Sequence, residues 1–315
     1  MTQQQQRTEA PRWCSREATD ADEHAHNLRD WQQRYDQLSA GTFYGRIDEV
    51  ALPQLQLFHE HTSQTLHQQC NVWPDSVWLG FSARRQECRI NGQPVAVDEL
   101  MCRPGNCHFE LLTPENYDIY GIAVSESALQ YSAGIQGITL DKSMWAQPRR
   151  PWDERKLNML RYAMQRLLAP AHTGLAGPLQ QDMLLTAVLD VLQQKAPQRN
   201  DSPAYTRRRA VVERVQEYLE QHPDEQASIT DLCALTHVSR RTLQYSFESV
   251  LGISPLRYLR VSRLNNVRRA LLEGLEEGET IAALAASRGF WHPGQFAHDY
   301  KELFGENPSE TLRRS

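Results

Sequence analysis

Hydrophobic and polar positions change their pattern near residue 125 of this 315-residue chain. Between about residues 43 and 124, short runs alternate apolar with polar side chains or gather β-branched ones, as in SVWLGFSA (76–83) and DIYGIAV (118–124). Turn signals at Asn91-Gly92 and Pro104-Gly105 separate these runs, a combination typical of strands joined by tight turns. The pattern predicts a compact antiparallel β region.

Two helical patterns follow the β region. Residues 153–169 and 178–194 each carry one apolar stripe at helical spacing. With these helices flanking it, the β region predicts one β-rich, cupin-like domain over residues 1–192. Residues 193–205 are rich in Pro, Asn, Asp, Ser and Gln and indicate a linker. Residues 206–315 carry helical patterns throughout, so we predict an α+β chain whose C-terminal domain is all-α.

The C-terminal domain contains an internal repeat. Ile229 pairs with Ile281, 52 residues later, whereas Leu243 pairs with Phe296, 53 residues later, so the spacing changes once, inside a turn. The pairs are Ile229/Ile281, Leu232/Leu284, Ala234/Ala286 and Val238/Phe290 before the turn, and Leu243/Phe296, Phe247/Tyr300, Leu251/Phe304, Gly252/Gly305 and Pro255/Pro308 after it. Two tandem helix-turn-helix motifs are therefore predicted, over about 229–250 and 281–303.

The second helix of the first motif presents groups that can read bases. At about 100° per residue, Leu243, Phe247 and Val250 define its buried face. Arg241, Tyr245 and Glu248 point roughly opposite, with Gln244 on the shoulder. Arginine pairs with the edge of guanine and glutamine with that of adenine. Serine is the expected N-cap, and the arginine after it is placed to meet a phosphate or an acidic neighbour. The candidate DNA-contacting residues are Ser239, Arg240, Arg241, Gln244 and Tyr245.

The corresponding face of the second motif is smaller and less charged. The same projection buries Phe296, Tyr300 and Leu303 and exposes Gly294 among polar neighbours. We expect this helix to position the domain and to discriminate less between bases. Its candidate DNA-contacting residues are His292, Pro293, Gln295, His298 and Lys301.

A long arginine-rich helix is predicted between the two motifs. A rigid helix of this length could hold two reading helices about one DNA turn (~34 Å) apart. Its arginines would then be available to phosphates. They are Arg257, Arg260, Arg263, Arg268 and Arg269.

The stretches HVSRRTLQYSFESVLGISPLRYLRVSRLNNVRRALL and AASRGFWHPGQFAHDYKELFGENPSETLR resemble the DNA-binding domain of AraC/XylS-family regulators, over about residues 207–313. The resemblance implies a seven-helix domain of a bacterial, cytoplasmic activator that contacts two adjacent major grooves of double-stranded DNA and acts through RNA polymerase. It assigns base-reading positions to Arg241, Gln244 and Tyr245 in the first motif, and to Pro293, Gln295 and His298 in the second. Pro293 and Gly294 depart from the polar residues often found there.

The first domain carries a weaker resemblance. WQQRYDQLSAGTFYG, VWPDSVWLG and RPGNCHFELLTPENYDIYGIAVSE are similar to the sensor half of regulators related to the ethanolamine-utilisation activator. That resemblance implies a small-molecule effector, with ethanolamine and adenosylcobalamin as the associated compounds. The sequence has no Asp-x-His-x-x-Gly cobalamin motif, so the residues themselves name no cofactor.

Bulk charge neither supports nor excludes a nucleic-acid partner. The chain has a net charge of −5, but residues 203–315 contain 15 basic and 15 acidic side chains, which places the whole excess in the first two-thirds. No apolar run approaches the ~18 residues that span a bilayer, and the first residues lack the apolar segment of a secretory signal. Six scattered cysteines fit reduced thiols. These features predict a cytoplasmic protein that does not enter the membrane.

Several side-chain groups in the first domain have two interpretations. His59, His61 and His67 could begin a metal site on a strand, but the carboxylate expected a few residues later is absent, which favours simple polar positions. The second group is Cys102, Cys107 and His108, for which buried thiols are favoured over a metal site. The third group is Trp73, Trp78, Phe81 and Phe109, for which core packing is favoured over a ligand pocket.

The sequence favours a ligand-responsive, sequence-specific transcription regulator, not an enzyme, and predicts no catalytic or metal residue. The alternatives are a cupin-type metal enzyme fused to a DNA-binding module and an architectural DNA-binding protein without a ligand. Residues 178–195 carry more apolar positions than one stripe needs, so this helix could form a homodimer across a two-fold axis or cover its own β domain. These positions are Leu179, Met183, Leu184, Val188, Val191 and Leu192.

Overall fold

The computed structural model describes residues 12–52, 54–145, 147–169, 177–193, 202–222 and 225–314. Contacts within the chain divide it into two compact parts. The β part comprises Met1–Tyr35, Tyr44–Ser63 and Gln68–Pro197, and the helical part comprises Asp36–Phe43, Gln64–His67 and Gln198–Ser315.

Most of the predicted linker, residues 194–201, lies outside the described residues. The prediction is wrong at its end, because α5 (Pro203–Gln221) already begins at Pro203. The Ser202 side chain caps this helix by accepting a hydrogen bond from the Tyr205 amide at 3.3 Å. Proline suits the first helical position because its φ is preset and it has no N–H to leave unpaired.

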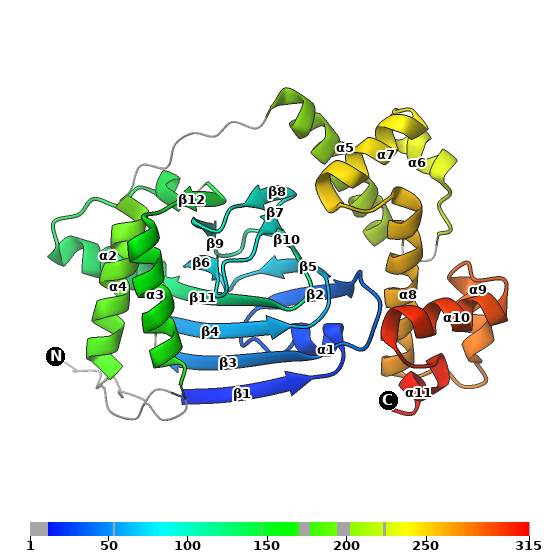
Figure 1. The fold of residues 1–315 in the computed structure, drawn as a ribbon, viewed down its shortest axis with the longest axis horizontal. Helices are drawn as coiled ribbons and strands as arrows, with labels where there is room; N and C mark the ends of the chain where they lie inside the picture. Colours follow the sequence, from blue (N-terminus) through cyan, green and yellow to red (C-terminus); the bar gives the residue numbers. More distant parts are fainter. Residues whose placement is uncertain are drawn as a thin grey trace, which may run out of the picture. The chain divides into compact units, whose positions relative to one another are not determined.

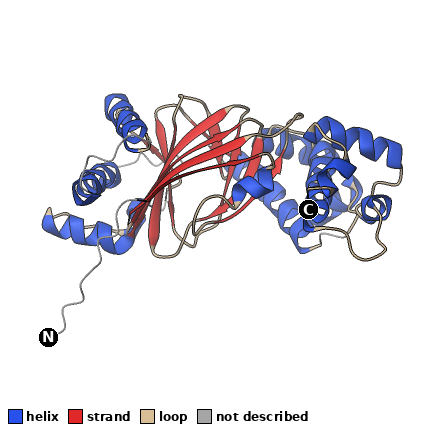
Figure 2. Ribbon diagram, turned by 90° about the horizontal axis from the view of Figure 1, so that it is seen from below, coloured by secondary structure: helices blue, strands red, loops and turns tan. Residues whose placement is uncertain are grey.

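Two sheets form the β part (Figures 1 and 2). Within the described residues the larger has the strand order β1-β3-β4-β11-β6-β9-β12 and the smaller β2-β5-β10-β7-β8. The pairings of β3 with β4 and of β4 with β11 are antiparallel over eight residues each. The strands are β1 (Arg12–Ala18), β2 (Gln32–Gln37), β3 (Gly45–Leu52), β4 (Leu55–Thr62), β5 (Leu66–Asn71), β6 (Ser76–Ser82), β7 (Cys88–Ile90), β8 (Gln93–Val95), β9 (Glu99–Pro104), β10 (Phe109–Thr113), β11 (Tyr117–Ser125) and β12 (Arg149–Pro151).

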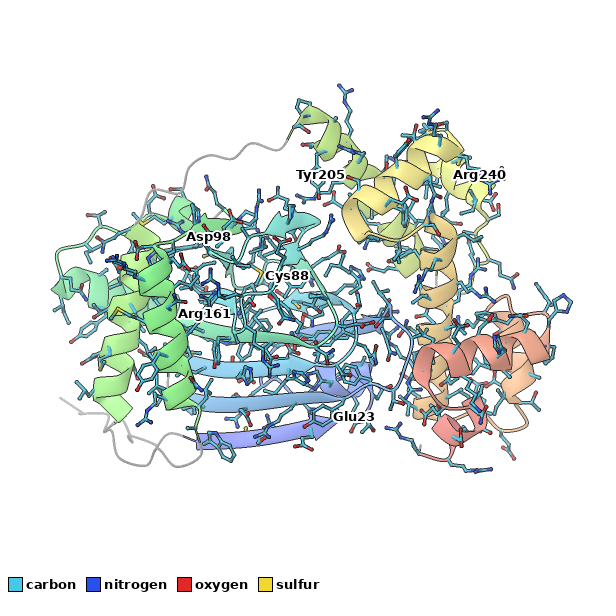
Figure 3. All side chains as sticks on the ribbon, viewed as in Figure 1. Glu23, Cys88, Asp98, Arg161, Tyr205 and Arg240 are labelled. Atoms are coloured by element: carbon cyan, nitrogen blue, oxygen red, sulfur yellow. The ribbon has the colours of Figure 1, made fainter. Side chains whose placement is uncertain are left out.

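One face of the larger sheet packs on helices. Leu57 of β4 belongs to a continuous apolar core that also contains Leu160 and Val188 of the covering helices. Arg161 of α3 binds this helix to the β part by donating hydrogen bonds to the carbonyls of Ser82 at 2.9 Å and Val97 at 3.0 Å (Figure 3). The helices on this side are α2 (Glu126–Ile135), α3 (Glu154–Leu167) and α4 (Gly177–Gln193).

The other face of the larger sheet meets the smaller sheet through aromatic rings. Trp31, which precedes β2, packs edge-on against Phe58, Trp78 and Phe109, with ring centroids 5.5–6.5 Å apart. Glycine makes room for these rings: a Cβ on Gly121 would lie 2.0 Å from the Phe58 ring. The sequence predicted core packing for Trp78 and Phe109, and both are buried.

The helical part contains, between residues 202 and 314 as described, seven helices. A first apolar core joins α5, α6 and α7 to the start of α8, around Val215, Leu232 and Phe247. The helices are α5 (Pro203–Gln221), α6 (Ile229–Thr236), α7 (Arg240–Leu251), α8 (Pro255–Glu273), α9 (Ile281–Ser287), α10 (Pro293–Phe304) and α11 (Pro308–Leu312).

The α+β class and the split into a β-rich and an all-α region are confirmed. Three strands and two α-helices of the β part lie outside the predicted stretches, namely β1, β2, β12, α1 (Ala21–Ala25) and α2. β1 and β2 are edge strands of the two sheets, and edge strands commonly carry polar side chains that blunt the alternation. Their residues, RWCSREA and QQRYDQ, are mostly polar, which hid them from a search for apolar periodicity.

Candidate nucleic-acid interface

The first helix-turn-helix motif, α6 and α7, is closed by local hydrogen bonds. Ser228 and Asp231 form a capping box at the start of α6, and hydrogen bonds from Ser228 lower the pKa of the Asp231 carboxyl. α6 is followed by its C-cap residue His237, whose backbone is left-handed with φ of 54°. The Ser239 hydroxyl then accepts from the Thr242 amide at 3.2 Å and starts α7. Ser239 is thus an N-cap, as the sequence predicted.

α7 buries one face and exposes the predicted reading residues. Leu243 and Phe247 are fully buried, whereas Arg240, Arg241 and Tyr245 are exposed. Arg240 lies at the first turn of α7 (Figure 3). The structure therefore brings these side chains together at the exposed surface, where they remain candidates for DNA contact.

Neighbouring side chains hold two of these groups in place. The Arg241 guanidinium lies over the Tyr245 ring, 5.5 Å from its centroid. Gln244 donates from its amide nitrogen to the Glu248 carboxylate at 2.6 Å. The second amide hydrogen and the carbonyl oxygen of Gln244 are the donor and acceptor that pair with adenine. Glu248 therefore orients this amide without consuming the groups that read a base.

The second motif, α9 and α10, has the same core and a different surface. Phe296 and Tyr300 are buried, as predicted. His292 is the N-cap residue of α10 but makes no side-chain capping bond, and Pro293 occupies the first turn. The predicted contact residues are all exposed: His292, Pro293, Gln295, His298 and Lys301.

Asp299 is a residue of this site that the sequence interpretation missed. It is only 7% exposed, accepts from the Gln295 amide nitrogen at 2.7 Å and forms an ion pair with Arg260 of α8. The sequence could have indicated this role, because an acidic residue between the buried positions Phe296 and Tyr300 needs a positively charged partner. Gln295 is thus held by a carboxylate that α8 itself anchors.

The expectation that the α8 arginines are available to phosphates is wrong for Arg268. This side chain is buried, pairs with Glu306 at 2.8 Å and lies over the Phe304 ring at 4.6 Å. Arg263 donates to the Ala227 carbonyl at 2.8 Å, and burial lowers its pKa. With Arg260 bound to Asp299, these arginines fasten α8 to both motifs.

The histidines of β4 meet a carboxylate that the sequence did not place beside them. His59 and His61 contact Asp118 of β11, with nitrogen–oxygen distances of 3.0 and 3.3 Å, and Arg84 binds the other carboxylate oxygen at 2.9 Å. Burial would raise the pKa of Asp118, but hydrogen bonds and charges from both histidines lower it. His67 lies on β5, in the other sheet. Among the described residues no three side chains are arranged to hold a metal ion.

The prediction of buried thiols is confirmed for Cys102 and wrong for Cys107, which is only partly buried. Cys102 is fully buried, and burial raises its thiol pKa to about 12. Cys107 instead accepts a hydrogen bond from Arg103 at 2.6 Å near the surface. All six cysteines are free thiols.

Comparison with known proteins places this geometry in a family. Residues 232–314 match the family of helix-turn-helix domains. The chain is 37% identical over 97 residues to the probable thc operon regulatory protein of Rhodococcus erythropolis, covering 31% of this chain and 29% of that protein. It is 36% identical over 100 residues to XylDLEGF operon transcriptional activator 2 of Pseudomonas putida, covering 32% and 64%.

A crystal structure of a probable AraC family transcriptional regulator from Rhodopseudomonas palustris shares 40% identity over 33% of this chain and 96% of that chain, with a TM-score of 0.30. The helical part of the chain thus carries a DNA-binding domain of the AraC/XylS type. The match lies in the helical part, and the chain spans under a third of the length of the first curated relatives.

Both motifs fall within or across the matched residues, whereas the β part lies outside them. Sequence similarity therefore covers α7 and α10 and does not extend to the histidines of β4. In the part of the chain that the structure describes, no helix combines the length and apolarity needed to cross a membrane.

Proposed function

We propose that the protein is a sequence-specific transcription regulator that binds double-stranded DNA through α7 and α10. One observation carries the proposal: two helix-turn-helix motifs, joined by one helix, each expose the face of their second helix that bears hydrogen-bonding side chains. A helix of this kind fits the major groove of B-form DNA. Activation through contact with RNA polymerase, implied by the family resemblance, is part of the proposal.

Arg241 and Gln244 are the base readers of the first motif in this proposal. Arginine pairs with guanine and glutamine with adenine, each through two hydrogen bonds. Ser239 and Arg240 lie at the N-terminal end of α7, where phosphate contacts set the position of the helix on the duplex. His298 and Lys301 provide polar contacts from the second motif.

The modular organisation predicted from sequence leads to a direct test. A fragment from residue 203 to 315 should fold alone and bind DNA with an affinity that falls steeply as salt rises, because phosphate neutralisation releases counterions. Selection from a pool of randomised duplexes then identifies the preferred sequence. If the fragment folds but enriches no sequence from the pool, this result would contradict the proposed function.

A small amine is the effector that we propose for the β part. The support is a pair of buried carboxylates beside the aromatic rings between the sheets, since carboxylates and aromatic faces both attract ammonium groups. Glu49 is fully buried and accepts from Gln56 at 2.9 Å, and Gln56 accepts from Trp31 at 2.9 Å. Glu60 accepts from Tyr35 at 3.0 Å and lies 3.1 Å from His24, and Glu49 pairs with Arg16 at 3.0 Å, so a bound amine would compete with these partners. Ethanolamine and adenosylcobalamin are the candidates that the resemblance supplies.

Ligand and DNA must then strengthen each other's binding by the same factor, because both favour one state of the chain. A thermal-shift screen of small amines, amino acids and cobalamins on the full-length chain tests the effector. The same screen on the fragment from residue 203 is the control. A compound that stabilises the fragment as much as the full-length chain would remove the β part from the sensing role.

We also propose that α3 and α4 form a homodimer contact. Between them lies a groove of about 900 Å³, bordered by the exposed side chains Met159, Tyr162 and Met183. Exposed apolar surface of this kind marks sites of protein association. Lys156 of α3 and Asp190 of α4 form an ion pair at 2.7 Å beside the groove and hold the two helices together. Sedimentation of residues 1–195 tests the proposal, and a monomer at tens of micromolar would contradict it.

A further inference from the structure

The turn of the second motif contains one residue that the first motif lacks. Val238 and Phe290 are counterparts 52 residues apart, whereas the N-cap residues Ser239 and His292 are 53 apart. Trp291 is the residue in between, so it has no counterpart in the first motif. Trp291 directly precedes His292, the N-cap residue of α10.

Trp291 is also one of the most exposed large apolar side chains of the described residues, with 68% of its surface accessible. Phe290, beside it, packs against Phe296 with ring centroids 5.2 Å apart and completes the core. The indole N–H of Trp291 has no hydrogen-bond partner within the described ranges. An inserted tryptophan that adds nothing to the core and exposes apolar surface to water points to contact with a partner.

The surface next to Trp291 lacks the side chains that serve the first motif. At the spacing of 53, Arg240 and Arg241 correspond to Pro293 and Gly294. Nothing lies within 4 Å of the place where a Cβ on Gly294 would be. The first turn of α10 therefore offers no long hydrogen-bonding side chain, while leaving its backbone open to close approach.

We propose that Trp291 is a specificity-determining residue that packs against a thymine methyl group in the major groove contacted by α10. The methyl is the apolar feature of the major-groove edges and is the group an exposed aromatic ring can distinguish. Apolar contact in the second motif thus replaces the arginine contact of the first. This inference rests on the proposed DNA-binding function and adds a base preference to it.

The test uses the full-length chain and a duplex that the wild type selects from a randomised pool. Trp291→Ala should weaken binding to that duplex on the order of tenfold and leave binding to a random duplex almost unchanged. Trp291→Phe, which keeps an aromatic ring, should restore most of the affinity. Tyr131→Ala removes an equally exposed ring from the β part and is the matched control.

Uracil scanning separates apolar recognition from a general loss of binding. Replacing single thymines by uracil removes only the methyl group, so one position should weaken the wild type and leave Trp291→Ala unaffected. Iodide quenching of tryptophan fluorescence should also fall when the selected duplex is added. Equal uracil effects in both proteins, or quenching unchanged by DNA, would overturn the inference. Failure of the wild type to select any duplex would instead overturn the proposed function.

Discussion

The two helix-turn-helix motifs share an interior and differ at the surface. Leu243 and Phe247 in the first motif correspond to Phe296 and Tyr300 in the second, and all four are buried. Both second helices end at a glycine in the left-handed region, with φ of 72° and 75°. The exposed first turns, by contrast, share no side chain. Packing and capping conserve the repeat, whereas each surface is left to acquire its own partner chemistry.

The largest expected effect concerns the anchoring of the second motif. Arg268→Ala should lower the free energy of unfolding by about 3 kcal/mol, because it removes a buried ion pair and its packing on Phe304. Arg313→Ala, at an exposed position of the same region, should change it little. Urea denaturation of the two variants gives the comparison, and equal stabilities would show that α8 is not held through Arg268.

Arg241→Ala tests whether the first motif reads bases. It should cost on the order of 1–3 kcal/mol on the selected duplex and little on random DNA. Gel-shift titrations on both duplexes provide the measurement. An equal loss on the two duplexes would assign Arg241 to phosphate contact.

Gly294→Arg tests the contrast from the opposite direction, by giving α10 the residue that α7 has. Because the site of its Cβ is open, the fold should remain intact. The added charge should raise affinity for random DNA about three- to tenfold at low salt, and the gain should disappear as salt rises. Gly294→Gln is the neutral control. A salt-independent gain would mean that the arginine contacts something other than phosphate.

Asp299→Ala and Glu248→Ala compare the two carboxylates that orient glutamines. Asp299 is nearly buried and Glu248 is exposed. Losing Asp299 should cost about 1 kcal/mol of stability, reduced by the partial exposure of Arg260, while losing Glu248 should cost under about 0.5 kcal/mol. Thermal denaturation of both variants at matched salt checks the order. The reverse order would contradict the anchoring of Gln295 through α8.

The last difference between the motifs is in alkaline sensitivity, since Tyr300 titrates and its counterpart Phe247 does not. Burial raises the pKa of Tyr300 to about 12, so the folded state retains a proton that the unfolded chain loses near 10. Stability from this group is complete below about pH 10 and is lost as the pH rises toward 12. Tyr300→Phe should flatten that decline relative to the wild type in urea denaturation at pH 8 and pH 11. An unchanged decline would assign it to other groups.

Local periodicity predicted the helical part in detail but only the class of the β part. The repeat located α6, α7, α9 and α10 within a residue or two, because core positions recur along one helix and need no knowledge of distant partners. The meeting of His59 and His61 with Asp118 depends on pairing β4 with β11, which lie nearly sixty residues apart in the chain. Single-residue patterns contain no information on such pairing.

The roles of the arginines illustrate a second limit. Arg241 and Arg268 both occur in helical patterns with polar neighbours, and sequence assigned both to DNA. Only the fold shows that Arg268 lies between α8, α10 and α11, where it donates to the Tyr300 hydroxyl and forms an ion pair with Glu306. A long charged side chain carries no local mark of burial, because its partner can lie on any helix.

The anchoring of α8 sets a rule for the spacing of the DNA sites. Arg263 binds this helix to the first motif, and Arg260 and Arg268 bind it to the second. The helix is about 28 Å long for its 19 residues, so it holds the two motifs at a fixed distance. Inserting one base pair between the two contacted segments would turn the second segment by about 34° around the duplex axis. Because the two motifs are held at a fixed distance and angle, one of them would lose its contact with the DNA. Regulated promoters should therefore keep a constant number of base pairs between the segments even where the intervening sequence varies freely.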